Sequence, residues 1–292
     1  MKKWTQFLWI VALYSCNAPL QVDSVDLLPE HTFAVPGIEG PATASDGTIY
    51  AVSYGRRGTV GFMKMLDDKS ITHGLFIELP AGSTGNGIRF DREGTMYIAD
   101  YTAHNVLKVD MSTREVSVFA HNAQMNQPND IAIDPVTQNL YASDPRWADS
   151  TGKLWLIDRA GETILLEEQM GTTNGIEVSP DGKKLYVNES IQRNIWVYSI
   201  GKNGTVENKK LFFHFPDYGL DGMRCDPANG NLYVTRHGKG TVIVLSPDAK
   251  VVKEYRLKGK LPSNITQGKD GRWYVTMADR GCFEVIKGVW VK

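Results

Sequence analysis

Cysteine is scarce in this chain, with three residues among 292. Cys225 and Cys282 lie beyond the first sixteen positions, and neither has a His or another Cys nearby at the spacing of a zinc site. Two cysteines are too few for a disulfide framework in a domain of this size. We therefore expect both to be structural thiols, and the fold to depend on a hydrophobic core that 42% apolar residues can supply.

An excess of charge of either sign is also missing. Lysine and arginine number 32 against 33 aspartate and glutamate residues, and the formal net charge is −1. Nucleic-acid-binding surfaces concentrate positive charge, so we expect no nucleic acid partner. No acidic or basic block of the kind that forms an interaction tail is present either.

Long hydrophobic runs are absent apart from a short one near the N-terminus. Lys2 and Lys3 precede the apolar stretch 7–13, which is too short to span a bilayer. A basic start followed by a short apolar run and small residues is typical of a secretory signal. We expect residues 1–15 to be a signal peptide that is removed on export.

The end of this signal resembles a bacterial lipobox. Residues 13–16 read Leu-Tyr-Ser-Cys, which implies cleavage before Cys16 and lipidation of its thiol. The protein would then be a periplasmic or outer-membrane lipoprotein that contacts the membrane only through its lipid anchor. The alternative is an ordinary secreted protein in which Cys16 is incidental.

The remainder of the chain contains a repeat. Six polar residues each begin a short alternating pattern that reaches a tyrosine 11 or 12 residues later: Glu39 with Tyr50, Asn86 with Tyr97, Asn129 with Tyr141, Asn174 with Tyr186, Asp221 with Tyr233, and Ser263 with Tyr274. The polar residues recur every 42 to 47 positions, a period typical of propeller blades. No segment shows a long helical period. We predict an all-β fold, a six-bladed β-propeller over residues 36–292.

Turns and ring closure fit the same prediction. Asp-Gly pairs between strand patterns, as at 181–182 and 270–271, are strong hairpin signals. The segment 16–35 precedes the first repeat and contains a strand-like stretch at 32–35. We expect this segment to be a tether, and its strand to complete the last blade beside the C-terminal strands. Closure of this kind removes exposed sheet edges.

The six polar residues that begin the repeats predict a binding site. The first strand of each blade lines the central channel, so these side chains should meet around one axis. They present two carboxylates, three amides and one hydroxyl, and such an all-oxygen set suits a hard cation such as Ca²⁺. The alternative is that they only begin turns, where Asn and Asp are common. Glu39 fits that alternative poorly, because Glu is not a turn residue.

Four motifs resemble those of the senescence-marker-protein/gluconolactonase/luciferin-regenerating family. In order they are Glu39-Gly40-Pro41, Pro128-Asn129-Asp130, Asn174-Gly175 with Ser-Pro-Asp-Gly at 179–182, and Asp221-Gly222-Met223. The resemblance extends over about residues 36–280. It implies a calcium-dependent hydrolase of lactones or related esters on a six-bladed propeller, with Zn²⁺, Mg²⁺ and Mn²⁺ as alternative ions. The metal ligands that it implies are Glu39, Asn129, Asn174 and Asp221.

The chain departs from the sugar-lactonase pattern in one place. Relatives of that type often have Arg two residues before the equivalent of Asn129, and Gly after the Asn-Asp pair. This chain has Gln127 and Ile131 at these positions. The departure leaves the implied metal site intact, but it weakens an aldonolactone as the expected substrate.

Two aspartates are candidate catalytic residues. Asp221 is the first candidate for general base or nucleophile beside a metal that polarises a carbonyl. Asp130 is the second, and its alternative role is to orient the neighbouring Asn129 amide. No Gly-x-Ser-x-Gly elbow is present, which disfavours a serine hydrolase.

Loops after the second strands should surround the same channel mouth. The candidate substrate-binding residues are Arg57, Tyr101, Arg146, Arg236 and His237, with Asn86 from the channel itself. Arginine suits carboxylate and phosphate groups, so we expect an anionic or polyhydroxylated small molecule. For each loop residue the alternative is a solvated side chain. We expect a monomer.

Two other functions stay open on the sequence. A non-catalytic propeller, stabilised by calcium, would present its surface to a protein or a glycan, since a propeller fold does not determine function. An aryl ester or organophosphate hydrolase would need apolar loops at the mouth, whereas the candidate loops contain arginines.

Overall fold

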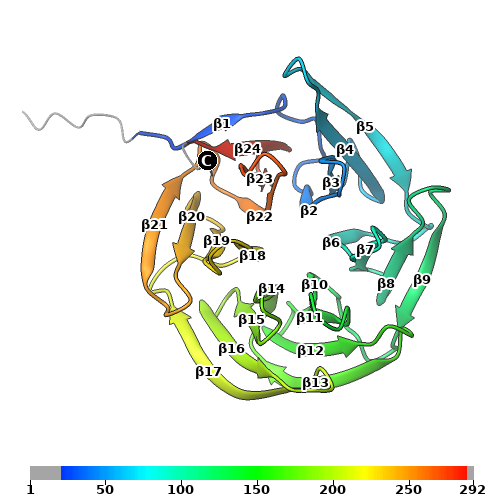
Figure 1. Cartoon of the computed structure of the whole chain (residues 1–292), viewed down its shortest axis with the longest axis vertical. Helices are drawn as coiled ribbons and strands as arrows, with labels where there is room; N and C mark the ends of the chain where they lie inside the picture. The colour runs from blue at the N-terminus through cyan, green and yellow to red at the C-terminus, as the bar shows by residue number, and fades with distance from the viewer. Residues whose placement is uncertain (1–20, 288–292) are drawn as a thin grey trace, which may run out of the picture.

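Residues 21–287 are the part of the chain that the computed structural model describes. They fold into six antiparallel four-stranded sheets set around one axis, and no helix occurs among them (Figure 1). The predicted six-bladed β-propeller is confirmed. Within the described residues no helix is long and apolar enough to cross a membrane. The predicted signal peptide and Cys16 lie outside residues 21–287.

The first three blades follow one another along the chain. Blade one contains β2 (Glu39–Thr43), β3 (Ile49–Val52), β4 (Thr59–Met65) and β5 (Ile71–Glu78). Blade two contains β6 (Gly85–Phe90), β7 (Met96–Asp100), β8 (Asn105–Val109) and β9 (Val116–His121). Blade three contains β10 (Ile131–Ile133), β11 (Leu140–Arg146), β12 (Thr151–Ile157) and β13 (Thr163–Met170).

The last three blades continue the series. Blade four contains β14 (Thr173–Val178), β15 (Lys184–Glu189), β16 (Asn194–Ile200) and β17 (Val206–His214). Blade five contains β18 (Met223–Cys225), β19 (Leu232–Arg236), β20 (Thr241–Leu245) and β21 (Val251–Arg256). Blade six contains β22 (Pro262–Gln267), β23 (Trp273–Met277), β24 (Cys282–Ile286) and the N-terminal β1 (Ser24–Asp26).

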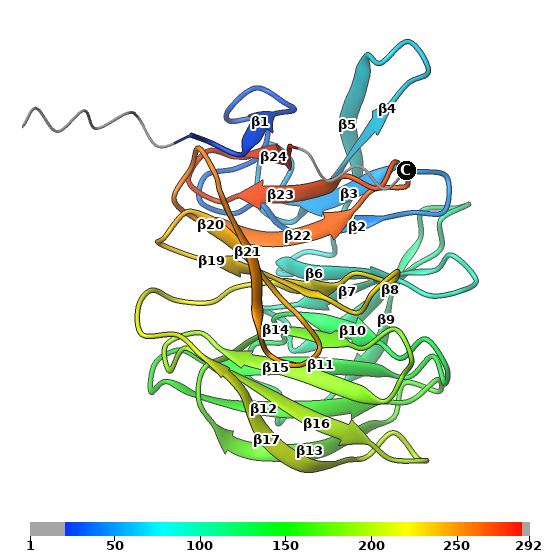
Figure 2. The ribbon, with the colours of Figure 1, turned by 60° about the vertical axis from the view of Figure 1, so that its left-hand side comes forward.

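The inner strands β2, β6, β10, β14, β18 and β22 surround the axis, and the fourth strands form the perimeter (Figure 1). The β4–β5 hairpin of blade one extends beyond the rest of the ring (Figure 2). Since every inner strand begins at the same end of the molecule, residues at the strand starts are brought to one mouth of the channel.

Ring closure occurs as predicted through a strand within residues 16–35, but the strand lies at 24–26 and not at 32–35. β1 pairs with β24, with Ser24 opposite Ile286, so the N-terminal and C-terminal strands share blade six. The stretch 32–35 was predicted to be that strand, and this is wrong. Phe33 forms an isolated bridge with Tyr54, and its N–H donates to the carbonyl of Gly281 at 2.8 Å, but it belongs to no strand. Its ring packs edge-on against Tyr54 and Phe283 at centroid distances of 5.2 and 5.6 Å. Its alternating pattern reflects one buried aromatic side chain between blades.

The core consists of wedges between neighbouring blades. Each of the six hydrophobic clusters joins residues of two adjacent sheets, including blades six and one. The repeating tyrosines are all buried in these wedges: Tyr50, Tyr97, Tyr141, Tyr186, Tyr233 and Tyr274. Burial of large side chains at equivalent positions explains why the repeat is visible in the sequence, because each blade must fill the same gap.

Candidate functional site

The six polar residues at the starts of the inner strands line one cavity of about 430 Å³ on the propeller axis. We call them the axial ring: Glu39, Asn86, Asn129, Asn174, Asp221 and Ser263. The register shifts between the first two strands of blades one, two, four and six, at the residues that carry the ring members of those blades. The structure thus brings together all six residues that the repeat singles out.

Four oxygens of the axial ring are buried and lack a hydrogen-bond partner within the described part of the chain. They are Glu39 Oε2, Asn86 Oδ1, Asn129 Oδ1 and Asn174 Oδ1. Buried polar atoms are nearly always paired in folded proteins, and each exception needs an explanation. Four unpaired acceptors in one ring, with no unpaired donor among them, indicate a site for a positively charged or hydrogen-bond-donating ligand.

The two carboxyl groups of the axial ring lie in an unfavourable electrostatic environment. Burial raises the pKa of Glu39 to about 7, and the negative charge of Asp130 adds to the effect. Burial also raises the pKa of Asp221 well above its usual range, and the negative charge of Glu39 acts in the same direction. A cation between the two groups would stabilise their ionised forms and lower both pKa values.

The donor set of the axial ring fits a hard divalent cation. Among residues 21–287 no group of three or more His, Cys, Asp or Glu side chains is placed to hold a metal. The axis offers instead two carboxylates and three amide oxygens, the ligand types that Ca²⁺ takes in proteins. Glu39, Asn129, Asn174 and Asp221, the ligands implied by resemblance, all belong to this set.

A second layer of polar residues lies deeper on the same axis. We call it the inner cluster, and it consists of Arg89, Asp130, Glu177, Arg224 and Asn264. Arg89 Nη1 lies 3.0 Å from Asp130 Oδ1, and Arg224 Nη1 lies 3.5 Å from Asp130 Oδ2. Arg89 Nη2 also lies 3.3 Å from Glu177 Oε2. The two guanidinium groups therefore face two carboxyl groups, and their formal charges cancel.

Burial shapes the ionisation of the inner cluster as well. Burial raises the pKa of Glu177, while the positive charges of Arg89 and Arg224 oppose that rise. Burial together with the charge of Arg89 lowers the pKa of Arg224 to about 10. The cluster is held together by its opposite charges, so the removal of one member would leave another buried charge uncompensated.

Asp130, the second predicted catalytic residue, is part of this inner cluster and does not line the cavity. Its side chain is fully buried, and Oδ1 accepts hydrogen bonds from Arg89 and from the backbone N–H of Ile131. A carboxylate in this position cannot reach a substrate in the cavity. The alternative role was orientation of the Asn129 amide, but the side-chain partners of the Asp130 carboxylate are Arg89, Arg224 and Asn264.

The predicted mouth residues divide into two groups. Arg57, Tyr101 and His237 line the axial cavity together with Trp147. Burial lowers the pKa of His237, which favours the neutral imidazole. Burial also raises the pKa of the Tyr101 hydroxyl.

Arg146 and Arg236 do not line the cavity, and their prediction as substrate-binding residues is not supported by their positions. Arg146 pairs with Asp149 at 3.0 Å and is exposed. Arg236 is buried, pairs with Asp217 at 2.8 Å and stacks over the ring of Phe215 at 3.9 Å from its centroid. Each guanidinium group pairs with a carboxylate outside the cavity, so the mouth is less rich in arginine than the loops suggest.

The sequence did offer a signal for the inner cluster that the repeat alone did not reveal. Four members of the axial ring are followed directly by glycine, whereas Asn129 is followed by Asp130 and Ser263 by Asn264. Arg89, Glu177 and Arg224 each lie three residues after a ring member. When the six repeats are aligned, the position after the ring member is glycine in four blades and a large polar residue in the other two. The third position after the ring member is charged in three blades. Together these two positions predict a packed polar layer beside the axial ring.

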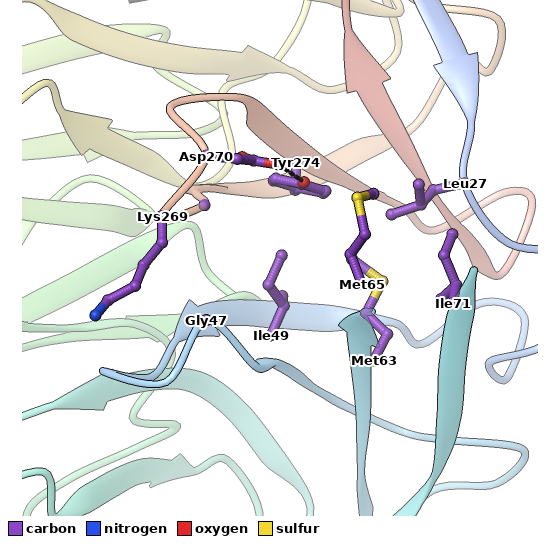
Figure 3. Close-up of a pocket in the computed structure, with 10 residues that line it drawn as sticks. Leu27, Gly47, Ile49, Met63, Met65, Ile71, Lys269, Asp270 and Tyr274 are labelled. Carbon is purple, nitrogen blue, oxygen red and sulfur yellow. Dashed lines mark hydrogen bonds between the residues drawn. The ribbon is translucent and has the colours of Figure 1, made fainter. Parts of the chain in front are cut away.

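A second cavity of about 210 Å³ lies between blades one and six (Figure 3). Its lining is mainly apolar and includes Leu27, Ile49, Met63, Met65, Ile71 and Tyr274. The nearby carboxylate of Asp270 is already bonded to the Tyr274 hydroxyl and to Arg272 Nε, both at 2.7 Å. Because this cavity has no converging unpaired polar atoms, the axial cavity is the candidate functional site.

Comparison with known proteins agrees with this geometry. The family profile described as the SMP-30/Gluconolactonase/LRE-like region matches residues 59–279. A gluconolactonase of Zymomonas mobilis is 32% identical over 200 residues, which are 59% of this chain and 55% of the relative. The chain thus spans about half the length of that relative. The diisopropyl-fluorophosphatase of Loligo vulgaris is 27% identical over 269 residues, which cover 82% of this chain and 84% of that protein.

Solved structures share the fold at low sequence identity. The calcium-binding protein regucalcin from Agrobacterium tumefaciens matches with a TM-score of 0.76 at 19% identity, covering 92% of this chain and 95% of the other. A gluconolactonase from Xanthomonas campestris matches with a TM-score of 0.73 at 18% identity, covering 88% and 87%.

Proposed function

The chain belongs to the SMP-30/gluconolactonase/LRE-like family, and from that premise we propose that it hydrolyses lactones or related carboxylic esters, using a divalent cation held at the axial ring. Ca²⁺ is the first choice of ion, and Zn²⁺, Mg²⁺ and Mn²⁺ are alternatives. The observation that supports this best is the set of four buried and unpaired oxygens on one axis. Relatives named as lactonases add support, although the chain covers only part of their length.

The residues of the axial ring would divide the work. Glu39, Asn129, Asn174 and Asp221 would hold the ion through their side-chain oxygens. When bound, a divalent cation supplies a Lewis acid that polarises the carbonyl oxygen of the ester. Asp221 lines the cavity, so its carboxylate would lie beside both the ion and the substrate. It would accept the proton of the attacking water, with nucleophilic attack by Asp221 itself as the alternative.

The cavity wall would select and orient the substrate. The side chain of Arg57 can pair with a carboxylate or phosphate on the substrate, and Asn86 can accept a hydrogen bond from a hydroxyl group. The faces of Tyr101 and Trp147 can pack on a sugar ring or an acyl group. These residues support an anionic or polyhydroxylated lactone as the small-molecule substrate. We also propose that the protein is a monomer.

A second candidate is an aryl ester or organophosphate hydrolase. Because Arg146 and Arg236 are held elsewhere, the mouth is less cationic than the loops suggest, and Ile38, Trp147 and Ala278 add apolar surface to the cavity. The similarity to a diisopropyl-fluorophosphatase over most of both chains adds to this candidate.

The test is hydrolysis of a substrate panel by chelator-stripped protein to which Ca²⁺, Mg²⁺, Mn²⁺ or Zn²⁺ is restored singly. The panel contains aldonolactones, neutral lactones, an aryl ester and an organophosphate. We expect lactone hydrolysis that is lost on chelation and restored by Ca²⁺. Preference for the aryl ester or organophosphate would favour the second candidate. No hydrolysis, with a melting temperature that still rises with Ca²⁺, would favour a non-catalytic calcium-stabilised propeller that binds a protein or glycan.

Export and lipidation remain part of the proposal, on the sequence of residues 1–16 alone. Metabolic labelling with a fatty acid should mark the wild-type protein and should fail in Cys16→Ala. Labelling that persists in the variant would exclude Cys16 as the anchor.

A further inference from the structure

The carboxamide of Asn264 connects the axial ring to the inner cluster. Its Nδ2 atom donates to Glu39 Oε1 at 2.9 Å and to Asp130 Oδ2 at 3.3 Å. Its Oδ1 atom accepts from the backbone N–H of Ile265 at 2.9 Å and from Arg224 Nη1 at 3.2 Å. All four hydrogen-bonding positions of the amide are occupied, and its side chain is fully buried. The amide is therefore fixed in one orientation, with its nitrogen toward the two carboxyl groups.

The space for this amide is provided by a glycine of the neighbouring blade. Gly222 follows the ring member Asp221, and a methyl group on its Cα would overlap the carboxamide carbon of Asn264. The backbone N–H of Gly222 also donates to the carbonyl of Ser263 at 2.7 Å, so blades five and six are joined at this point. The φ angle of Gly222 is not positive, so the requirement for glycine here is one of space and not of backbone conformation.

The same arrangement recurs on the opposite side of the axis. Asp130 of blade three lies over Gly87 of blade two, where a methyl group would overlap the Asp130 carboxylate. The N–H of Gly87 donates to the carbonyl of Asn129 at 2.9 Å. Blades two and three are three positions away from blades five and six. Two such arrangements on one axis indicate that the polar side chains are placed there by the fold and are not incidental.

The bond from Asn264 divides the two oxygens of Glu39. Oε1 is occupied by the amide, whereas Oε2 is buried and unpaired at the cavity. We propose that Asn264, supported by Asp130 and Arg224 and admitted by Gly222, is a positioning residue that presents a single oxygen of Glu39 to a cation at the axial ring. This inference rests on the proposed function only in assuming that a cation binds there. It assigns to the inner cluster a purpose beyond stability.

Two substitutions test the inference by different means. Asn264→Leu keeps the shape of the side chain but removes the donor to Glu39. Gly222→Ala keeps every hydrogen-bonding group but fills the space that the amide needs. The controls are Gly74→Ala, whose new methyl would lie 3.2 Å from the Phe62 ring on the outer strand of blade one, and Asp134→Asn, a buried carboxylate in the hairpin turn of blade three.

The measurement is Ca²⁺ affinity by isothermal titration calorimetry on chelator-stripped protein, well below the melting temperature of each variant. We expect Asn264→Leu and Gly222→Ala to bind Ca²⁺ about 10- to 100-fold more weakly, the range found when residues that support metal ligands are removed. Both controls should bind as the wild-type protein does. With saturating Ca²⁺, kcat for the best lactone should fall in Asn264→Leu while KM changes little, because Glu39 faces the ion rather than the substrate.

The outcomes separate this inference from the proposed function. Wild-type affinity in both test variants would overturn the positioning role even if the protein proves to be a lactonase. Ca²⁺ binding that weakens as expected would support it even if no lactone is hydrolysed. If Asn264→Leu does not fold, Gly222→Ala alone decides between these results. Absence of divalent-cation binding by the wild-type protein would overturn both.

Discussion

The axial ring takes one residue from each of the six blades, and the inner cluster takes one from each of blades two to six. The two sets lie on the same axis but differ in how their polar atoms are paired. In the axial ring four buried oxygens have no partner within residues 21–287, and burial raises the pKa of both carboxyl groups. In the inner cluster two arginines face two acids, and no buried side-chain atom is unpaired. We infer that the inner cluster, whose buried polar atoms all have partners, supports the structure around the site. The axial ring, whose buried oxygens lack partners, is the part that binds a ligand. The predictions that follow test this contrast.

The largest effect is expected from the axial ring itself. Asp221→Asn should lower kcat/KM for the best substrate by on the order of 10³-fold or more, since metal-assisted charge stabilisation is worth several kcal/mol. Calcium should also cease to raise the melting temperature, because an ion that binds only the native state stabilises it by mass action. Asp248→Asn, an exposed carboxylate in the β20–β21 turn of the same blade, is the matched control. Near wild-type activity in Asp221→Asn would exclude the axial ring as the catalytic site.

The next largest effect is expected in the inner cluster, where a substitution should lower the stability of the metal-free protein. Arg224→Met should lower the free energy of unfolding by about 3–5 kcal/mol, because it leaves Asp130 and Glu177 buried with a single cation. Urea denaturation of metal-free protein measures this. Arg56→Met, which breaks an exposed pair with Glu78, should cost less than about 1 kcal/mol. Equal losses in the two variants would remove the distinction between the inner cluster and a surface ion pair.

A smaller effect is expected from pH in the metal-free protein. Glu39 has a pKa of about 7 in the folded state, above its ordinary value of 4.5, so the folded state holds the proton more tightly. The stability from this group should be complete below about pH 4.5 and lost as pH rises through about 7, by up to about 3 kcal/mol. Stabilisation by added Ca²⁺ should follow the opposite course and grow with pH, because the ligands must be deprotonated.

Urea titrations in chelator at about pH 5 and about pH 8 measure the pH effect, and the difference between wild type and Glu39→Gln isolates Glu39. The variant should show the weaker dependence. If the stability of the wild type and of Glu39→Gln changed equally between these pH values, the raised pKa of Glu39 would be excluded.

The smallest effect is expected at the cavity wall. Arg57→Met should raise KM for a lactone that bears a carboxylate or phosphate by about tenfold, equal to about 1.4 kcal/mol, with kcat unchanged. A neutral lactone should be hydrolysed as by the wild type. Arg146→Met, which removes an exposed arginine outside the cavity, is the control. Equal changes for charged and neutral lactones would mean that Arg57 does not bind the anionic group.

The fold and the axial ring were predictable because each propeller blade repeats the same short sequence pattern. Each blade needs a tyrosine in its wedge and a polar residue at its inner strand, and these recur at a nearly fixed spacing. The closing strand was misplaced because residues 32–35 resemble a strand in sequence. Phe33 is apolar there because its side chain is buried between blades one and six. A pattern along the chain reports which side chains are buried, and it does not report which backbone groups pair.

The inner cluster could not be assembled from spacing alone. Asp130 and Arg224 are 94 residues apart in sequence and meet only because blades three and five both direct inner side chains toward the axis. The loop arginines show the same limit. Spacing places Arg146 and Arg236 near the mouth, but Asp149 and Asp217 decide where their guanidinium groups lie. Such choices between competing partners depend on distances that the sequence does not contain.

The distribution of charge around the axial ring has a consequence for the orientation of a substrate. Glu39 of blade one and Asp221 of blade five lie on either side of blade six, whereas blades two, three and four contribute the neutral amides of Asn86, Asn129 and Asn174. The six-fold arrangement of the backbone is therefore reduced to a ring with an acidic side and an amide side. A lactone whose carbonyl points to the axis can turn its ring oxygen toward the acidic side or toward the amide side, and these two orientations should differ in energy. The charge distribution would therefore favour one orientation of the lactone ring in the cavity.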